Sequence, residues 1–367
     1  MSKIEFKDVS FSYSNSGKNS ILEHMSTSFD SDKITVLTGP SGCGKSTILY
    51  LTAGIYPQYT GVLKKDEILV DGQRVGQLPP DKRCSIVNMM FQNPDLQFCM
   101  DTVENEVLFC LGNIRTPKEE MSLIMDSALE FCGITHLKNR TLQSLSGGEK
   151  QKAMLSCLIV LKPKWLLLDE PFANVDEKSA KELVQKIKQL HDKGTGILVV
   201  DHRLDYWLPI AHEIRLMDRN HRLEQIGHKV DELTDKMLVD MGLLAINGHY
   251  RLDSEEKNHE DIEPVLQLNK ISVKRGNEDV LKDISATFYE KKVYAIVGES
   301  GSGKTTLFGA INGLYKYQGD ILLKGKNIKK PLGYKAGTIG FVTQNPQDQF
   351  VTNTVLEEIE LGLRRIK

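Results

Sequence analysis

Residues 39–47 read GPSGCGKST, and this stretch decides the fold. An apolar, β-branched run, ITVL at residues 34–37, precedes it, and a run typical of a helix follows from Ser46 to Ala53. In such a loop, glycines let backbone N–H groups turn inward around phosphate oxygens, and the N-terminus of the next helix adds positive charge. The spacing therefore predicts a phosphate-binding loop between a strand and a helix, in which Lys45 reaches the β- and γ-phosphates and Ser46 ligates Mg²⁺.

The same loop occurs a second time, because residues 298–306 read GESGSGKTT. Downstream of the two loops lie related segments, QNPDLQFCMDTVENEV from Gln92 and QNPQDQFVTNTVLEEI from Gln344, in which eight of sixteen positions are identical. A repeat of this length is too long for a solenoid, so each copy should be a domain. We therefore predict a complete domain over residues 1–245, an acidic linker over 246–263 and the N-terminal part of a second copy over 264–367.

Composition and charge narrow the classes of function. The 367 residues carry 47 Lys and Arg against 49 Asp and Glu, without the basic excess that nucleic-acid binders usually show. The six cysteines include no C-x-x-C pair, which excludes zinc-finger and disulfide-framework folds and is typical of a reducing cytosol. No apolar run reaches the ~18 residues that a membrane helix needs, so we expect contact with a membrane only through a partner protein.

Two further apolar runs end in polar residues. Residues 165–170 read WLLLDE, and residues 198–202 read LVVDH. Alone, WLLLDE fits a buried strand with acidic residues at its end equally well. Combined with the phosphate loop, it predicts a strand whose Asp169 supports Mg²⁺ and whose Glu170 orients and deprotonates the attacking water. His202, at the end of another short strand, is then suited to contact the γ-phosphate.

Residues 145–151 read LSGGEKQ, and a helical run follows them. By itself, Ser-Gly-Gly-Glu is an ordinary helix cap. Ordered after a phosphate loop and Gln92, and just before LLLDE, it resembles the signature of ATP-binding-cassette (ABC) ATPases. The resemblance covers the whole first copy in family order and part of the second. It implies an α/β P-loop NTPase fold, with a RecA-like mixed sheet core, an antiparallel β subdomain and a helical subdomain.

The resemblance also implies the residues of the site. Tyr13 takes the position that stacks on adenine, and the catalytic candidates are Glu170, His202 and Gln92. The ATP-binding candidates are Tyr13, Gly39, Ser41, Gly42, Gly44, Lys45, Ser46, Thr47, Ser146, Gly147 and Gly148, with Gly298, Ser300, Gly301, Gly303, Lys304, Thr305, Thr306 and Gln344 in the second copy. The candidate ligands of the cofactor Mg²⁺ are Ser46, Gln92, Asp169, Thr305 and Gln344.

A finer resemblance points to ATPases of energy-coupling-factor importers, which take up vitamins, their precursors or transition-metal ions. It rests on the Gln-Asn-Pro-x-x-Gln-Phe segments, on FANVD ending at Asp176 and on DHR at residues 201–203. It implies an integral membrane scaffold and a substrate-binding membrane subunit as partners, and a peripheral location on the cytoplasmic membrane face. The candidates for the groove that receives the scaffold are Gln97, Phe98, Gln349 and Phe350, although both phenylalanines fit core positions too.

Three features depart from the family pattern. Glu149 replaces the commoner Gln of the signature, and Arg275 stands opposite Tyr13 in the second copy. The counterparts of Ser146 and His202 would fall beyond Lys367, so we expect no second signature, carboxylate pair or closing histidine in these residues. A complete ATP site would then need a second nucleotide-binding domain, in cis or by homodimerisation.

Two other functions compete with transport. One is a soluble tandem ABC ATPase resembling translation factors, which carry a long charged helical linker between their cassettes. The linker here is short and acidic, and the near-neutral charge disfavours ribosomal RNA as a partner. The other is a non-hydrolysing truncated regulator, against which the intact Glu170 counts.

Overall fold

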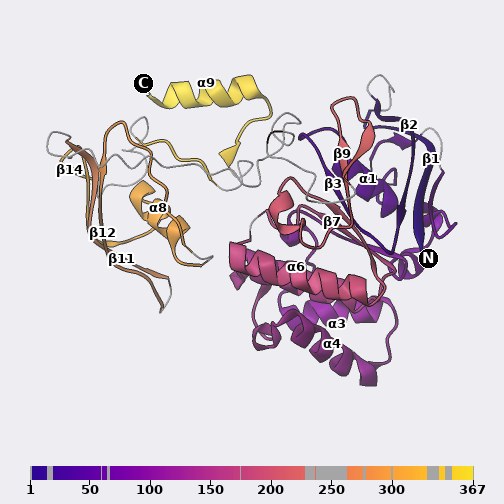
Figure 1. Cartoon of the computed structure of the whole chain (residues 1–367). Coiled ribbons are helices and arrows are strands. Elements are labelled where there is room, and N and C mark those ends of the chain that lie inside the picture. Colours follow the sequence, from indigo (N-terminus) through magenta and orange to yellow (C-terminus); the bar gives the residue numbers. More distant parts are fainter. Residues whose placement is uncertain are drawn as a thin grey trace. The chain divides into compact units, whose positions relative to one another are not determined.

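The computed structural model describes residues 2–14, 20–58, 60–63, 67–173, 175–227, 236, 263–275, 278–298, 301–328, 339–343 and 349–366. The chain divides into two units, Met1–Arg251 and Leu252–Lys367, and each is described by itself (Figure 1). The predicted linker, residues 246–263, lies outside the described residues except for its last residue. Within the described part of the chain, no helix combines the length and the apolar character needed to cross a membrane.

A six-stranded sheet forms the centre of the first unit. Its order is β10-β9-β3-β8-β7-β6, and its strands are β3 (Ile34–Thr38), β6 (Val87–Met90), β7 (Trp165–Asp169), β8 (Gly196–Val200), β9 (Glu213–Met217) and β10 (Leu223–Gly227). All neighbours pair in parallel except β10, which runs antiparallel to β9 at the edge. Every residue of β3, β7 and β8 is buried, as expected of parallel strands covered on both faces.

Successive residues of the central strands enter two different cores. Leu166 and Leu168 of β7 belong to one cluster of buried side chains, and Trp165 and Leu167 belong to the other. This alternation follows from the two-residue period of a strand, which sends neighbouring side chains to opposite faces of the sheet. The sheet therefore separates a helical layer from a layer of antiparallel strands.

The antiparallel layer packs one helix, α1 (Lys45–Thr52), against the central sheet. Its strands are β1 (Lys3–Ser12), β2 (Ser20–Asp30), β4 (Val62–Leu63) and β5 (Ile68–Val70), with β1 paired to each of the other three. Ile4, Phe6 and Phe11 of β1 are buried in the same cluster as Ile48 and Leu49 of α1. This layer therefore packs on the helix that follows the phosphate loop.

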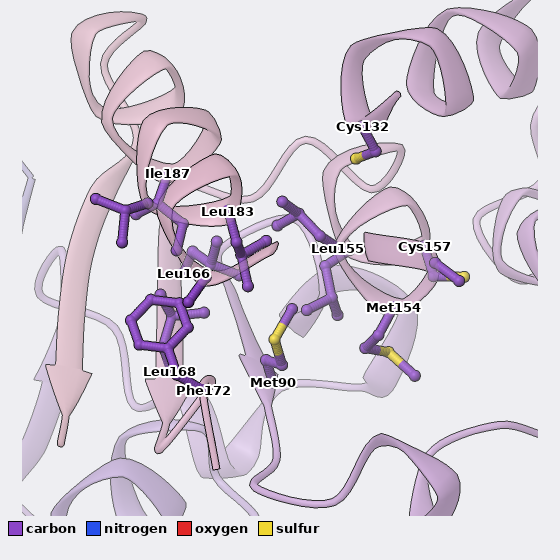
Figure 2. Close-up of a cluster of buried hydrophobic side chains, with 14 of the residues drawn as sticks. Met90, Cys132, Met154, Leu155, Cys157, Leu166, Leu168, Phe172, Leu183 and Ile187 are labelled. Atoms are coloured by element: carbon purple, nitrogen blue, oxygen red, sulfur yellow. The ribbon is translucent and has the colours of Figure 1, made fainter. Parts of the chain in front are cut away.

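The helical layer covers the other face. Its helices are α3 (Val103–Asn113), α4 (Lys118–Cys132), α5 (Gly147–Ile159) and α6 (Glu177–Asp192). Figure 2 shows Leu183 and Ile187 of α6 directed toward Leu166 of β7, with Leu155 of α5 alongside. The short elements of this unit are α2 (Pro80–Arg83) and the 3-10 turns η1 (Val75–Gln77), η2 (Pro94–Leu96), η3 (Thr135–Leu137), η4 (Leu142–Ser144) and η5 (Leu204–Tyr206).

The second unit repeats the antiparallel layer. Its sheet has the order β12-β11-β13-β14, and its elements are β11 (Pro264–Arg275), β12 (Glu278–Tyr289), α8 (Lys304–Asn312), β13 (Gln318–Leu323), β14 (Lys326–Asn327) and α9 (Val355–Ile366). A small core joins strand residues such as Leu268 and Ile271 to Leu307 and Ile311 of α8. The pattern of β1, β2 and α1 is thus repeated by β11, β12 and α8.

One expected strand is missing from the second unit. Residues 293–297 (VYAIV) correspond to β3 by their position before the loop, but they form no strand, and Val293 and Val297 are 100% and 87% exposed. In the first unit β3 is held between β8 and β9. No described strand of the second unit pairs with residues 293–297. An apolar run becomes a buried strand only when neighbours supply its hydrogen bonds.

A pair of glycine substitutions tests the packing of the central sheet. A Cβ added at Gly196 would lie 2.7 Å from the indole ring of Trp165, whereas one added at Gly112 on α3 would meet no atom within 4 Å. We expect Gly196→Ala to lower the free energy of unfolding by about 1–3 kcal/mol through overpacking. Gly112→Ala should raise it by about 0.4–1 kcal/mol, because alanine has less backbone entropy to lose than glycine.

Urea unfolding followed by tryptophan fluorescence measures both effects, since the two tryptophans lie in the first unit. Equal stability of the Gly196→Ala variant and the wild type would contradict the close contact with Trp165.

Candidate active site

The phosphate loop runs between the end of β3 and the start of α1. Gly39 and Gly44 have φ angles of +142° and +104°, a region that residues with a Cβ rarely adopt. A Cβ at Gly39 would also collide with the backbone carbonyl of Met217 on β9. The two glycines are therefore required by the backbone, and the second of them is the N-cap of α1.

Lys45 is the first residue of α1 and is only 4% exposed. Its Nζ donates hydrogen bonds to the carbonyl oxygens of Gly39, at 2.7 Å, and Pro40, at 2.8 Å. The ammonium group therefore lies against the loop, beside the N-terminus of the helix. Both features carry positive charge and make the loop suitable for an anion.

Ser46 and Asp169 bring two oxygen donors together from α1 and the end of β7. The Ser46 hydroxyl donates a hydrogen bond of 2.8 Å to Oδ1 of Asp169. Burial raises the pKa of Asp169 to about 6, and the negative charge of Glu170 adds to this, against the opposing effects of Ser46 and Lys45. A nearby cation would relieve the cost of ionising this carboxyl group.

This pair fits Mg²⁺, which prefers hard oxygen ligands and usually completes its coordination with waters and substrate phosphates. The described residues contain no group of three or more His, Cys, Asp or Glu side chains that could hold a metal by themselves. Ser46 and Asp169 therefore suit an ion that arrives with a nucleotide, rather than one held in an all-protein cage.

Glu170 lies between Gln92 and His202. Its Oε2 accepts a hydrogen bond of 2.7 Å from Nε2 of Gln92, and its Oε1 lies 3.2 Å from Nε2 of His202. The hydrogen bond with His202 is the main cause that lowers the pKa of Glu170, and burial opposes it. The carboxylate therefore stays ionised at neutral pH and can accept a proton.

The backbone of Glu170 is unusual as well. Its φ of +43° is rare for a residue with a side chain, and its N–H donates to the carbonyl oxygen of Val200 on β8 at 2.8 Å. Strained conformations of this kind cost about 1–3 kcal/mol and persist only where the surroundings impose them. Here the neighbouring strand imposes the turn that separates Glu170 from Asp169.

A cavity of about 250 Å³ lies beside Lys45, Ser46, Glu170 and His202. Its lining consists of Tyr13, Ile21, Ser41, Gly42, Gly44, Lys45, Ser46, Thr47, Glu170 and His202. Tyr13 is 45% exposed, and its hydroxyl is hydrogen-bonded to Oγ1 of Thr47 at 2.8 Å. The ring of Tyr13 packs edge-on against Phe11 and Tyr56. The structure thus brings together residues that are separated by up to about two hundred positions in the chain.

The signature residues lie elsewhere in the first unit. Ser146 caps α5, where its hydroxyl accepts from the N–H of Glu149 while the Glu149 carboxylate accepts from the N–H of Ser146. Gly147 and Gly148 begin the helix, and none of the three lines the cavity. A Cβ at Gly148 would lie 2.7 Å from the Cβ of Ser179 on α6. Asp176, the N-cap of α6, accepts a hydrogen bond from the N–H of Ser179.

Two of the four residues predicted to border the partner groove, Gln97 and Gln349, form side-chain hydrogen bonds with the backbone of their own chain. The Gln97 amide accepts from the N–H of Phe91 at 2.7 Å and donates to the carbonyl oxygen of Met89 at 2.9 Å. Gln349 makes the same pair of bonds, with the N–H of Thr343 and the carbonyl oxygen of Phe341. Each amide therefore ties its segment to the backbone just before the segment begins.

The two phenylalanines of the predicted groove differ from each other. Phe98 is half-buried against the helical core, and Phe350 is 64% exposed.

A glutamate that both segments share was not among the predicted site residues, although it has a structural role in each. Oε2 of Glu106 accepts hydrogen bonds from the N–H groups of Cys99 and Met100. Oε2 of Glu358 accepts from the N–H groups of Val351 and Thr352. The signal was present, because this Glu is one of the eight identical positions of the repeated segment.

The second unit repeats the local geometry of the loop. Gly303 has a φ of +91° and caps α8, and Nζ of Lys304 donates to the carbonyl oxygen of Gly298 at 2.7 Å. Gly301 also has a positive φ, Thr305 is exposed and Thr306 is buried. Ser300 and Gln344, also predicted for this site, lie outside the described residues.

Arg275 of the second unit stands where the first unit has Tyr13. Its guanidinium lies 4.7 Å from the ring centre of Tyr315 and donates a hydrogen bond of 2.8 Å to the hydroxyl of that residue.

Comparisons with known proteins identify the family of the chain. A model of the ABC transporter family matches residues 22–173 and 281–364. The "Putative HMP/thiamine import ATP-binding protein YkoD" of Bacillus subtilis is 33% identical over 97% of this chain and 70% of its own length. A "Putative ABC transporter ATP-binding protein" of Treponema denticola is 31% identical over 98% of this chain and 74% of its own length.

Among solved structures, cbiO1 from Clostridium perfringens, part of the ABC transporter complex cbiONQ, is similar with a TM-score of 0.51 and 26% identity. The match covers 60% of this chain and 87% of that one. The predicted P-loop NTPase fold of an ABC cassette is thereby confirmed. The chain belongs to the ABC transporter family, as an ATP-binding subunit of the kind that hydrolyses ATP to drive transport.

Proposed function

We propose that this chain powers an importer of the energy-coupling-factor type, which takes up a vitamin, a vitamin precursor or a transition-metal ion. The observation that carries the ATPase part is the Glu170 carboxylate, held between Gln92 and His202 at a cavity that also contains Lys45. The import part is supported by the likeness to a relative named for HMP/thiamine import and to the cbiO1 structure. The repeated Gln-Asn-Pro-x-x-Gln-Phe segments support it as well.

ATP binding begins with the phosphate loop. The β- and γ-phosphates take the hydrogen bonds of Lys45 that the loop carbonyls accept in this structure. The exposed face of Tyr13 stacks on the adenine ring. Ser46 and Asp169, with Gln92 as a further candidate, would hold Mg²⁺, which when bound neutralises charge on the phosphate oxygens.

Hydrolysis then depends on Glu170. The carboxylate takes a proton from a water molecule while the water oxygen attacks the γ-phosphorus, so that ADP leaves and Glu170 becomes protonated. Gln92 and His202 hold the two carboxylate oxygens in a fixed direction. The lowered pKa keeps Glu170 ready to accept the proton at neutral pH.

The signature completes the site from another domain. Ser146, Gly147 and Gly148 lie apart from the cavity of their own unit, so they are suited to meet the phosphate loop of a partner domain. That domain comes from the same chain or from a second copy of it. In this proposal residues 1–245 are one nucleotide-binding domain, and residues 264–367 belong to a second one that uses Lys304 and Thr305.

The membrane partners are a scaffold and a substrate-binding subunit, and the chain lies at the cytoplasmic face of the membrane. The docking surface that we propose includes Phe98 and the neighbouring apolar side chains of Leu96 and Met100, which are 76% and 37% exposed. Gln97 and Gln349 shape the chain beside this surface and its counterpart at Phe350, through their bonds to the backbone.

Lys45→Ala should weaken the binding of Mg·ATP at the first loop at least tenfold, since a hydrogen bond to a charged group contributes about 1.5–3 kcal/mol. Titration calorimetry measures this in the Lys304→Ala background, so that the second loop does not contribute. Lys188→Ala, on the exposed side of α6, is the control for the loss of a positive charge. The same affinity in the Lys304→Ala protein and the double variant would exclude the first loop as the nucleotide site.

Glu170→Gln should reduce ATP turnover by about 10²–10⁴-fold and leave the affinity for ATP intact, because the amide keeps the shape but cannot take the proton. Turnover and ATP affinity are measured side by side. Glu177→Gln, at the exposed start of α6, is the matched control and should behave like the wild type. Wild-type turnover in the Glu170→Gln protein would assign the base to another residue.

Import is tested in cells that express the chain with the integral membrane proteins encoded beside it. We expect ATP-dependent accumulation of labelled thiamine, of a related vitamin or precursor, or of cobalt or nickel ions, and none when the chain carries Glu170→Gln. Equal accumulation with both chains, for every compound, would refute the import proposal and leave the ATPase assignment standing.

A further inference from the structure

We infer that Asp201 and Trp207 are positioning residues. They lie outside the cavity and fix the positions of Glu170 and His202 relative to each other. The inference rests on the proposed roles of Glu170 and His202 and adds two buried side chains that do not line the cavity. The contacts that carry it all lie within the first unit.

Asp201 precedes His202 in the chain and fixes the backbone around it. It is 4% exposed, and both of its carboxylate oxygens accept hydrogen bonds of 2.8 Å, Oδ2 from Nε1 of Trp207 and Oδ1 from the N–H of Arg203. The N–H of Asp201 donates to the carbonyl oxygen of Leu37, the residue before the end of β3. The backbone on either side of His202 is therefore tied by the side chain of Asp201 and by the central sheet.

Trp207 extends this connection to the chain that carries Glu170. Its indole ring is fully buried and lies 5.0 Å from the ring of Phe172, at an interplanar angle of 30°. Phe172 is two residues beyond Glu170, and Tyr206 contacts the same phenyl ring edge-on at 5.2 Å. Figure 2 shows Phe172 at the edge of the core formed by the end of β7 and the helices.

These contacts close a ring. In front, the side chains of Glu170 and His202 meet at 3.2 Å. Behind, Phe172 contacts Trp207, and Trp207 donates to Asp201. A carboxylate is an expensive group to bury, and it is tolerated here because two N–H donors satisfy it. Unlike an apolar side chain of similar volume, those hydrogen bonds have direction, so they define where His202 lies relative to Glu170.

The central variant is Trp207→Phe. It keeps an aromatic ring against Phe172 but removes the N–H that Asp201 accepts. A catalytic group displaced by about 1 Å costs on the order of 100-fold in rate, so we expect kcat for ATP hydrolysis to fall at least about tenfold. KM for ATP and the affinity for ATP should stay within about twofold, because neither residue lines the cavity.

The chain offers a matched control in its other tryptophan. Trp165 is also fully buried, and its Nε1 donates to Oγ of Ser2, but it starts β7 at the end opposite to Asp169. Trp165→Phe should destabilise the unit to a similar extent and leave kcat unchanged. If both variants lost the same amount of kcat, the effect of Trp207→Phe would be explained by lost stability alone. That result would overturn the inference.

Asp201→Asn is the second variant, because it keeps the size of the side chain. Combined with Trp207→Phe it should lose no more kcat than the larger of the two single losses, since both changes break one connection. Independent, multiplicative losses would contradict a shared role. The imidazole signals of His202 in NMR spectra should shift in Trp207→Phe and Asp201→Asn but not in Trp165→Phe, and unshifted signals in both would also overturn the inference.

Failure of this inference differs from failure of the proposed function. If Glu170→Gln abolishes turnover while Trp207→Phe and Asp201→Asn keep the wild-type kcat, only the positioning role falls. If Glu170→Gln turns over ATP like the wild type, the proposed base falls, and the NMR shifts of His202 alone decide whether the two side chains position the histidine.

Discussion

The parallel pairing of β7, β8 and β3 is the constraint on which the site depends. Hydrogen bonds between these strands continue one residue beyond their ends, where the N–H of Glu170 donates to Val200 and the N–H of Asp201 donates to Leu37. Because parallel strands end at the same edge of a sheet, three distant segments deliver their polar residues to one place. The phosphate loop, the carboxylate pair and the histidine meet there for this reason.

Two neighbouring carboxyl groups at this edge have opposite properties. Burial raises the pKa of Asp169 to about 6, whereas the hydrogen bond with His202 lowers the pKa of Glu170. Asp169 is the last residue of β7, and the positive φ of Glu170 marks the point where the chain leaves the strand. In the proposed mechanism, Asp169 supports the cation and Glu170 accepts the proton.

A comparison of the two units distinguishes contacts that depend on nearby residues from those that depend on distant segments. Lys304 contacts the second loop as Lys45 contacts the first, and Gln349 and Glu358 repeat the hydrogen bonds of Gln97 and Glu106. These hydrogen bonds are repeated because the donor and the acceptor of each lie within ten residues of each other in the sequence. The strand before the loop is not repeated, because β3 depends on β8 and β9, which lie more than a hundred and fifty residues further along the chain.

Much of the site was predictable because its signals are local. The glycines of the phosphate loop, the buried strand that ends at Asp169 and the cap formed by Ser146 and Glu149 all follow from residues within a few positions of one another. The polar ends of two apolar runs indicated Glu170 and His202 as candidates, and the resemblance to ABC ATPases added Gln92. Such patterns can be recognised from the sequence alone, since a loop, a strand end and a helix cap each depend only on residues close to them in the chain.

Other features were decided by the tertiary structure alone. Gln97 was predicted to border a partner groove, and the structure adds that its amide bonds to the backbone of its own chain. The bridge from Phe172 through Trp207 to Asp201 joins two segments about thirty residues apart, and no spacing rule connects them. The sequence by itself determined the local motifs, namely the phosphate loop, the strand end at Asp169 and the helix cap at Ser146. Which side chains stand behind Glu170 and His202 depended on the packing of distant segments, because a buried hydrogen bond or ring contact exists only when the fold brings both partners together.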